Sequence, residues 1–213
     1  MLRKTCLVMA LVLLVLPAVA QAQGDWIFRV RGIQIAPNDS SSEIPGTGTE
    51  VTVDSKTTIE VDLTYMLSDN LGLELIAATA RHDLGTSGGA LGGADAGSVK
   101  VLPPTLTLQY FFGDENYRPY IGAGINYTYF YSYDLSDDLA GLGVTDVEFS
   151  NSFGFAGDLG IDIGVGGNWV LNFDVKYIMI STDADLKVGS DTLARVEVDV
   201  DPWVYGIGIG VRF

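Results

Sequence analysis

The chain has 213 residues, with 12 Lys and Arg residues against 27 Asp and Glu residues and a formal net charge of −15. This acidity argues against nucleic-acid binding, which needs a basic surface, so we predict no nucleic-acid partner. The one cysteine, Cys6, lies among the first 22 residues, which excludes disulfides from the rest of the chain. No later segment reaches about 18 consecutive apolar residues, so we predict no transmembrane helix.

The N-terminus has the features of a secretory signal peptide. Arg3 and Lys4 precede an apolar run over residues 7–16, and Ala20-Gln21-Ala22 supplies a small-residue cleavage site. An apolar run of about ten residues is too short for a membrane anchor, which needs roughly 20. We therefore predict that residues 1–22 are cleaved and that residues 23–213 form one domain. Without Arg3 and Lys4 that domain has 10 basic against 27 acidic residues, a net charge of −17.

The last stretch, residues 203–213, predicts a membrane-spanning β-strand. Its large apolar side chains alternate with glycines and Arg212, so the large side chains share one face of the strand. In a soluble sandwich the second face would be polar, but here it is nearly bare. Outer-membrane barrels turn an apolar band toward lipid and need about 9–11 residues per strand to span it.

Eight segments with this alternation follow one another along the chain, and short turns alternate with long loops between them. The expected strands are residues 26–36, 57–67, 71–81, 99–112, 118–131, 149–165, 169–181 and a final segment that ends at 213. The long loops cover residues 37–56, 82–98, 132–148 and 182–194. The loop at 82–98 is glycine-rich and shows no alternation. An even strand count places both termini on the periplasmic side.

These patterns predict an all-β fold, an eight-stranded antiparallel transmembrane β-barrel in the bacterial outer membrane, surrounded by outer-membrane lipids. Aromatic residues fall near both ends of the strands, as expected for rings at the lipid headgroups. The alternative is a secreted sandwich or a lipocalin-like barrel, which also alternates. That fold would leave aspartates and glycines as its exposed face.

Four stretches carry a family resemblance. They are W-I-F-R-V-R-G-I at residues 26–33, L-P-P-T-L-T-L-Q-Y-F-F at 102–112, R-P-Y-I-G-A-G-I-N-Y-T at 118–128 and V-D-V-D-P-W-V-Y at 198–205. Together they resemble the outer membrane protein W family of eight-stranded barrels. The resemblance implies passage of small, mostly apolar molecules across the outer membrane. Transport of small amino acids is the alternative substrate class that it leaves open.

The inward positions of the lower barrel predict a charged plug. Eight strands leave an interior just wide enough for side chains to fill, and unpaired buried charge is costly, so these groups should pair. The predicted plug residues are Arg29, Arg31, Glu60, Asp62, Glu74, Asp158, Asp162, Asp174, Lys176 and Arg212.

Toward the loops the inward positions become apolar and predict a vestibule above the plug. The expected vestibule residues are Ile33, Ile35, Val101, Phe130, Ile178, Ile180, Val198 and Val200. They either bind an apolar solute or merely fill the upper barrel. Because the plug blocks the way down, a solute would need another exit. Pro103 and Pro104 cannot donate to the strand ladder, so they either open a lateral gap into the bilayer or only bend the strand through a bulge.

Two other functional classes compete with transport. His82 adjoins Asp83 near Ser87, but nothing in the sequence fixes these three in a catalytic geometry, and a loop histidine is more often solvated. We predict no enzyme, cofactor or metal site.

A surface barrel whose loops bind a partner, for example a phage or toxin, is the second class. The loop acids could bind divalent cations, but their spacing matches no cation-binding loop. We expect a monomer. The loop acids are Asp134, Asp137, Asp138, Asp146, Glu148, Asp183, Asp185 and Asp191.

Overall fold

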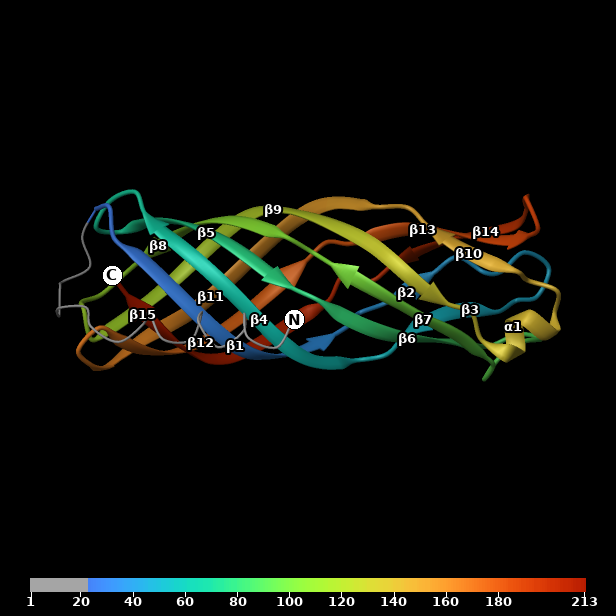
Figure 1. Cartoon of the computed structure of the whole chain (residues 1–213), viewed down its shortest axis with the longest axis horizontal. Coiled ribbons are helices and arrows are strands. Elements are labelled where there is room, and N and C mark those ends of the chain that lie inside the picture. The colour runs from blue at the N-terminus through green and yellow to red at the C-terminus, as the bar shows by residue number, and fades with distance from the viewer. Residues whose placement is uncertain (1–22) are drawn as a thin grey trace, which may run out of the picture.

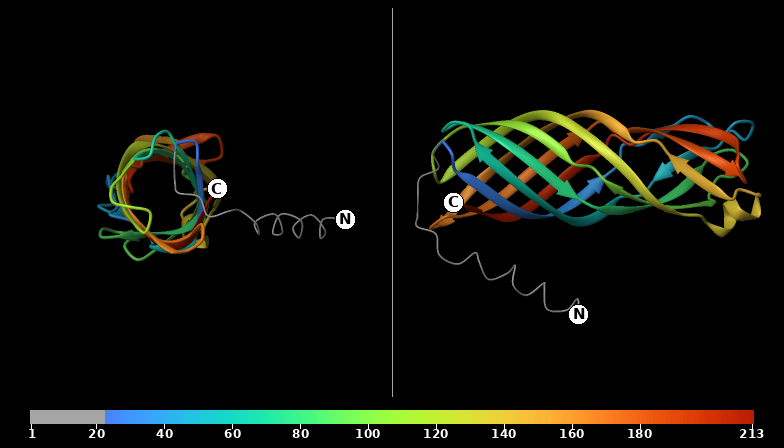
Figure 2. Two further views of the ribbon diagram at one scale, coloured as in Figure 1. Left: turned by 90° about the vertical axis from the view of Figure 1, so that its left-hand side faces the viewer. Right: turned by 45° about the horizontal axis from the view of Figure 1, so that its top comes forward.

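A computed structural model describes residues 23–213, which form a long closed tube (Figures 1 and 2). The predicted cleavage of residues 1–22 lies outside the described residues. The elements are β1 (Trp26–Ala36), β2 (Ser40–Ser41), β3 (Glu50–Val53), β4 (Lys56–Met66), β5 (Leu71–Ala78), β6 (Ala80–Ser87), β7 (Asp95–Leu102), β8 (Thr105–Phe111), β9 (Tyr117–Asp134), α1 (Asp137–Gly141), β10 (Asp146–Phe149), β11 (Ser152–Gly166), β12 (Trp169–Ile178), β13 (Ser181–Val188), β14 (Asp191–Asp199) and β15 (Trp203–Arg212).

Eight antiparallel strands close the lower half of the tube. Their order is β11-β12-β15-β1-β4-β5-β8-β9, and the pairing of β9 with β11 completes the ring. The predicted eight-stranded barrel is confirmed. Along β8, buried and exposed residues alternate strictly, as the period of two requires. Both ends of the described chain lie together, since the backbone N–H of Trp26 donates to the carbonyl of Phe213 at 2.7 Å.

The outer surface of this ring is a band of exposed apolar side chains. Ile59 and Phe155 are 65% and 66% exposed, which a soluble surface would not favour but hydrocarbon does. Aromatic pairs stand at both margins of the band. The ring centroids of Trp26 and Tyr65 lie 4.8 Å apart at the short-turn end. Tyr177 and Trp203 lie 5.1 Å apart at the other margin.

The long connections are largely not loops, and here the sequence prediction was wrong. The expected loop at 82–98 is a hairpin of β6 and β7, and the expected loop at 182–194 is mostly the hairpin of β13 and β14. Part of the loop at 132–148 forms α1, whose N-terminus is capped by the Ser136 hydroxyl. In β6 and β7 small residues and glycines weaken the alternation, whereas β13 does alternate, with Ala184 and Leu186 buried between acidic residues and Lys187, and the prediction passed over it.

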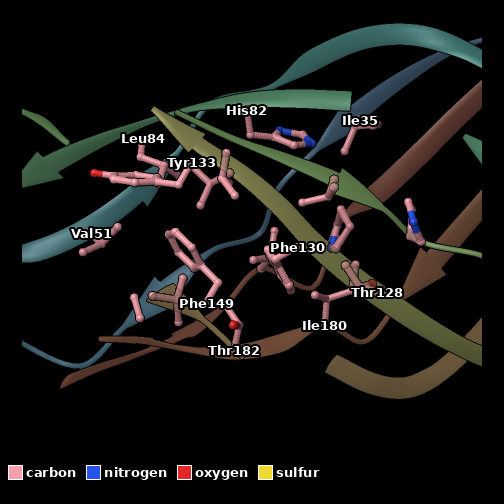
Figure 3. A pocket seen from close by; sticks show the side chains of 18 of the residues that line it. Ile35, Val51, His82, Leu84, Thr128, Phe130, Tyr133, Phe149, Ile180 and Thr182 are labelled. Carbon is pink, nitrogen blue, oxygen red and sulfur yellow. The ribbon is translucent and has the colours of Figure 1, made fainter. Parts of the chain in front are cut away.

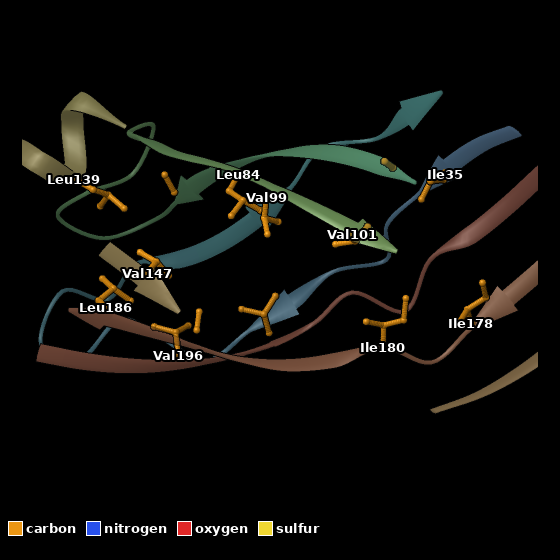
Figure 4. Packing of buried hydrophobic residues seen from close by; sticks show 14 of the residues in the cluster. Ile35, Leu84, Val99, Val101, Leu139, Val147, Ile178, Ile180, Leu186 and Val196 are labelled. Atoms are coloured by element: carbon orange, nitrogen blue, oxygen red, sulfur yellow. The ribbon is translucent and has the colours of Figure 1, made fainter. Parts of the chain in front are cut away.

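These extra strands build two facing sheets above the membrane band. One sheet has the order β10-β13-β14-β2, and β3, β6, β7 and the end of β9 form the opposite wall. The two walls extend the tube beyond its lower ring (Figure 1). A cluster of buried aliphatic residues, including Leu84, Val99, Leu186 and Val196, lies between them (Figure 4). The apolar interior therefore reaches well past the predicted strand ends.

Candidate functional site

Arg29 of β1 lies at the centre of the lower lumen and is fully buried. Its Nε and Nη2 donate to both carboxylate oxygens of Asp162 at 3.0 and 2.6 Å. Its Nη1 donates to Asp62 and to the Thr64 hydroxyl, each at 2.9 Å. The ladder between β1 and β4 sets Arg29 directly opposite Asp62. A planar guanidinium with five donors suits this arrangement of several acceptors.

Arg31, two residues further along β1, joins a second group of carboxylates. It donates to Glu60 at 2.8 Å and to Glu74 at 2.7 Å. Lys176 of β12 reaches the same Glu60 oxygen at 2.8 Å and also pairs with Asp174. Five strands thus contribute charged groups to one ion-paired network across the lumen. The network fills the barrel interior, as eight strands allow.

Neutral side chains complete the plug, and the sequence analysis missed their part in it. The Tyr120 hydroxyl donates to Asp174 at 2.7 Å. The Gln109 amide nitrogen bridges Glu74 at 2.7 Å and Asp158 at 2.6 Å. Asp158 is therefore held by Gln109, and no Lys or Arg among residues 23–213 forms an ion pair with it. Strand parity alone would have placed Tyr120 inside, because Ile121 faces lipid.

Arg212 faces the lumen, as predicted, but it lies at the short-turn end rather than in the ion-paired network. Its Nη1 donates to the backbone carbonyl of Glu115 at 2.9 Å.

Glycines of β15 leave the space that the arginines of β1 occupy. A Cβ atom added at Gly210 would lie 2.7 Å from Cγ of Arg29. The inward face of β15 therefore carries glycines because the arginine side chains of β1 lie against it.

An apolar cavity lies directly above the plug, with a volume of about 110 Å³. This is comparable to the ~150 Å³ apolar cavities that bind benzene. All eight predicted vestibule residues line it, with further residues from the two facing sheets such as Leu84 and Phe149 (Figure 3) and with Leu139 of α1. Glu60 and Ile76 mark its floor, where the apolar lining meets the charged network. The structure thus brings the predicted set together at one place.

His82 also lines this cavity, which corrects the prediction of a solvated loop histidine. It lies on the inward face of β6 and is 6% exposed. Burial lowers the pKa of His82 because the charged imidazolium is poorly solvated there. Asp83 points outward and pairs with Lys56 at 3.1 Å, so the histidine and its neighbour diverge. Ser87 lies at the far end of the same strand, opposite Glu50.

Pro103 and Pro104 separate β7 from β8, where the sequence predicted one continuous strand. The ladder to the neighbouring β5 and β6 stops at the pair Ile76–Thr105 and resumes at Ala80–Val101. On the other side β9 stays attached, since the N–H of Tyr127 donates to Pro104 at 3.1 Å. The ladder to β9 also skips Pro103 and Pro104, but this hydrogen bond bridges it, so the wider gap is on the β5 and β6 side. Ala78 and Pro103 beside that gap line the cavity.

Several of the loop acids already have partners. Asp185 accepts two hydrogen bonds from Arg195, at 2.6 and 2.8 Å. Asp134 pairs with Arg81 at 3.1 Å and Glu148 with Lys187 at 3.2 Å. Over residues 23–213, no group of three or more His, Cys, Asp or Glu side chains is arranged to hold a metal ion.

Comparisons with known proteins identify the family. The OmpW family model matches residues 22–213. Outer membrane protein W of Vibrio cholerae is 39% identical over 201 residues, covering 92% of each chain. The crystal structure of OprG from Pseudomonas aeruginosa is similar with a TM-score of 0.82 at 37% identity, covering 91% of this chain and 97% of that one.

The solution structure of Escherichia coli outer membrane protein W has a TM-score of 0.61 at 34% identity, covering 91% of this chain and all of that one. These relatives are outer-membrane proteins, so the barrel lies in the bacterial outer membrane. The chain belongs to the OmpW family of outer-membrane β-barrels.

Proposed function

We propose that this barrel is an outer-membrane channel for small, mostly apolar molecules. The observation that carries the proposal is the cavity above the plug, whose lining is almost wholly aliphatic and aromatic. An apolar solute gains free energy there at roughly 25 cal/mol per Å² of apolar surface removed from water. The ion-paired network beneath leaves such a solute no apolar route to the periplasm.

The exit in this proposal is lateral, at Pro103 and Pro104. The strand ladder is missing on one side of these residues, level with the exposed side chain of Leu102 on the outer surface. Ala77 and Ala78, which follow the last paired residue Ile76 of β5, put small side chains beside this interruption. A solute that leaves here enters hydrocarbon without crossing the charged lumen. The apolar cavity and the plug then act in sequence, the first to bind and the second to redirect.

Uptake by proteoliposomes tests the proposal, with p-xylene as apolar probe and glycine as polar probe at matched concentration. We expect selective p-xylene uptake that falls about tenfold in Phe130→Asp, because a carboxylate in the cavity is costly to bury. Phe130→Leu is the matched control and should retain most of the uptake. Glycine uptake without apolar preference would mean that the lumen opens an aqueous path. Uptake of neither probe would favour partner binding by the loops.

A further inference from the structure

The cavity is mostly apolar, and the hydroxyl groups of its lining residues all donate hydrogen bonds to protein oxygens. The Thr86 hydroxyl donates to the carbonyl of Leu91, that of Thr182 to Ser150, and that of Tyr133 to Ala96, at 2.5, 2.7 and 2.5 Å. Thr105 and Thr128 likewise donate to protein oxygens. Every hydroxyl proton on the cavity wall is therefore already used. A solute finds no free hydroxyl donor there.

His82 differs from these hydroxyl groups, because its ring offers the cavity a neutral hydrogen-bond acceptor. Its Nδ1 lies 3.1 Å from the backbone carbonyl of Asp54. A carbonyl oxygen only accepts hydrogen bonds, so Nδ1 carries the proton in the neutral ring and Nε2 is left with a free lone pair. Among residues 23–213, the carbonyl of Asp54 is the one hydrogen-bond partner of this ring. Leu84 and Thr86, on the same inward face of β6, also line the cavity.

The same cavity carries an aromatic surface, built from both walls. Phe149 of β10 stacks on Phe130 with ring centroids 5.7 Å apart, and Tyr133 lies 5.6 Å from Phe149. Phe149 belongs to the sheet that faces His82, whereas Tyr133 and Phe130 of β9 belong to the same wall as His82, with Val99 paired to both His82 and Tyr133 (Figure 3). Such rings favour planar aromatic ligands through offset or edge contacts.

From this juxtaposition we infer that the cavity selects apolar solutes that carry a hydroxyl group, with phenols as the best-fitting class. The ring of the solute packs against Phe130 and Phe149, and its hydroxyl donates to Nε2 of His82. Acceptor-only solutes such as aryl ethers gain nothing from this nitrogen. The inference rests on the proposed function, because it assigns a solute class to the same cavity.

The test compares three solutes of similar shape: p-cresol, which donates, 4-methylanisole, which only accepts, and p-xylene, which does neither. Binding to the full chain in lipid nanodiscs is measured for each, with empty nanodiscs subtracted. We expect His82→Leu to lower the p-cresol to p-xylene affinity ratio by about fivefold, the contribution of one neutral hydrogen bond. The 4-methylanisole to p-xylene ratio should not change.

Two variants keep the result interpretable. His82→Gln can donate to Asp54 through its amide and still offer a carbonyl oxygen, so the p-cresol preference should survive. Leu84→Met changes the same wall without a polar group and should move all three affinities together. If His82→Leu folds, still binds p-xylene and keeps the wild-type ratio, the inference is overturned and the channel proposal stands. If wild type binds none of the three, both are overturned.

Discussion

The lower lumen and the upper cavity share the same strands but have opposite chemistry. The inward residues of β1 run Arg29, Arg31, Ile33, Ile35, so the change occurs within about 7 Å, two residues of a strand. β12 makes the same change between Lys176 and Ile178. Because the closed ladder satisfies the backbone, the inner face is free to be either charged or apolar.

The two regions differ in what their side chains require. Each charge in the plug needs a partner at hydrogen-bond distance, so the plug residues fix one another in place. The cavity residues need only exclude water, and their contacts are non-directional. The barrel therefore combines a plug held together by ion pairs with a cavity that a solute can occupy without breaking any polar contact.

Loss of Arg31 from the plug should cause the largest fall in the unfolding free energy. Arg31→Met removes the guanidinium that pairs with Glu60, Asp62 and Glu74, and breaking a buried network of this kind costs about 3–5 kcal/mol of unfolding free energy. Urea unfolding in lipid vesicles measures it. Arg195→Met is the matched control, because that arginine pairs with Asp185 in solvent, and it should cause no measurable change. Equal effects of the two variants would contradict the comparison.

The neutral members of the plug should matter less than the charged ones. Tyr120→Phe keeps the ring but removes the hydroxyl that donates to Asp174, at a cost of about 1–3 kcal/mol. Tyr205→Phe, on the lipid-facing side of β15, serves as control and should leave stability unchanged. Urea unfolding measures the loss of unfolding free energy in both variants. A loss in Tyr120→Phe as large as that in Arg31→Met would contradict the expected difference between neutral and charged plug residues.

Restoring the strand ladder beside the cavity should slow the exit of an apolar solute without destabilising the plug. Pro103→Val combined with Pro104→Thr restores two backbone donors, that of residue 103 toward Ala77 and Ala78 and that of residue 104 toward β9. We expect p-xylene uptake to fall roughly tenfold, equivalent to ~1.4 kcal/mol on the exit barrier. Pro119→Val, in β9 near the periplasmic end, should leave uptake at the wild-type rate. Unchanged uptake in the double variant would remove the lateral route.

The smallest expected effect is a pH dependence confined to the cavity. Burial holds the pKa of His82 below its ordinary value, so the unfolded chain takes up a proton that the folded chain resists. Stability should therefore fall as pH drops through the ordinary histidine range toward the lowered folded pKa. The charged groups near the ring are Lys56 of β4, Asp54 and Asp83.

Thermal unfolding of wild type and His82→Leu between pH 7.5 and 5 isolates that contribution. The unfolding temperature of wild type should fall relative to that of His82→Leu as pH falls, because leucine has no proton to gain. A constant difference across this range would mean that the cavity does not penalise the imidazolium.

Sequence patterns predicted the lower barrel well because lipid on one side and a filled lumen on the other impose strict alternation. The same parity placed Ile35 and Ile178 on the cavity wall. It failed above the membrane band, where Gly85 and Gly97 interrupt the alternation in β6 and β7 and neither face meets lipid. His82 was missed for this reason: a histidine between an arginine and an aspartate appears solvated until its strand is recognised.

The pairing of β1 with β15 has a consequence for how the molecule is made. The ring closes between the first and last strands, so no complete barrel exists until the C-terminal residues are available. Arg29 faces Gly210 across that seam, which means that closure also encloses a fully buried cation against a glycine. An open half-barrel would present these charges and unpaired strand edges to hydrocarbon. Closure of the ring and enclosure of Arg29 therefore depend on the same strand pairing.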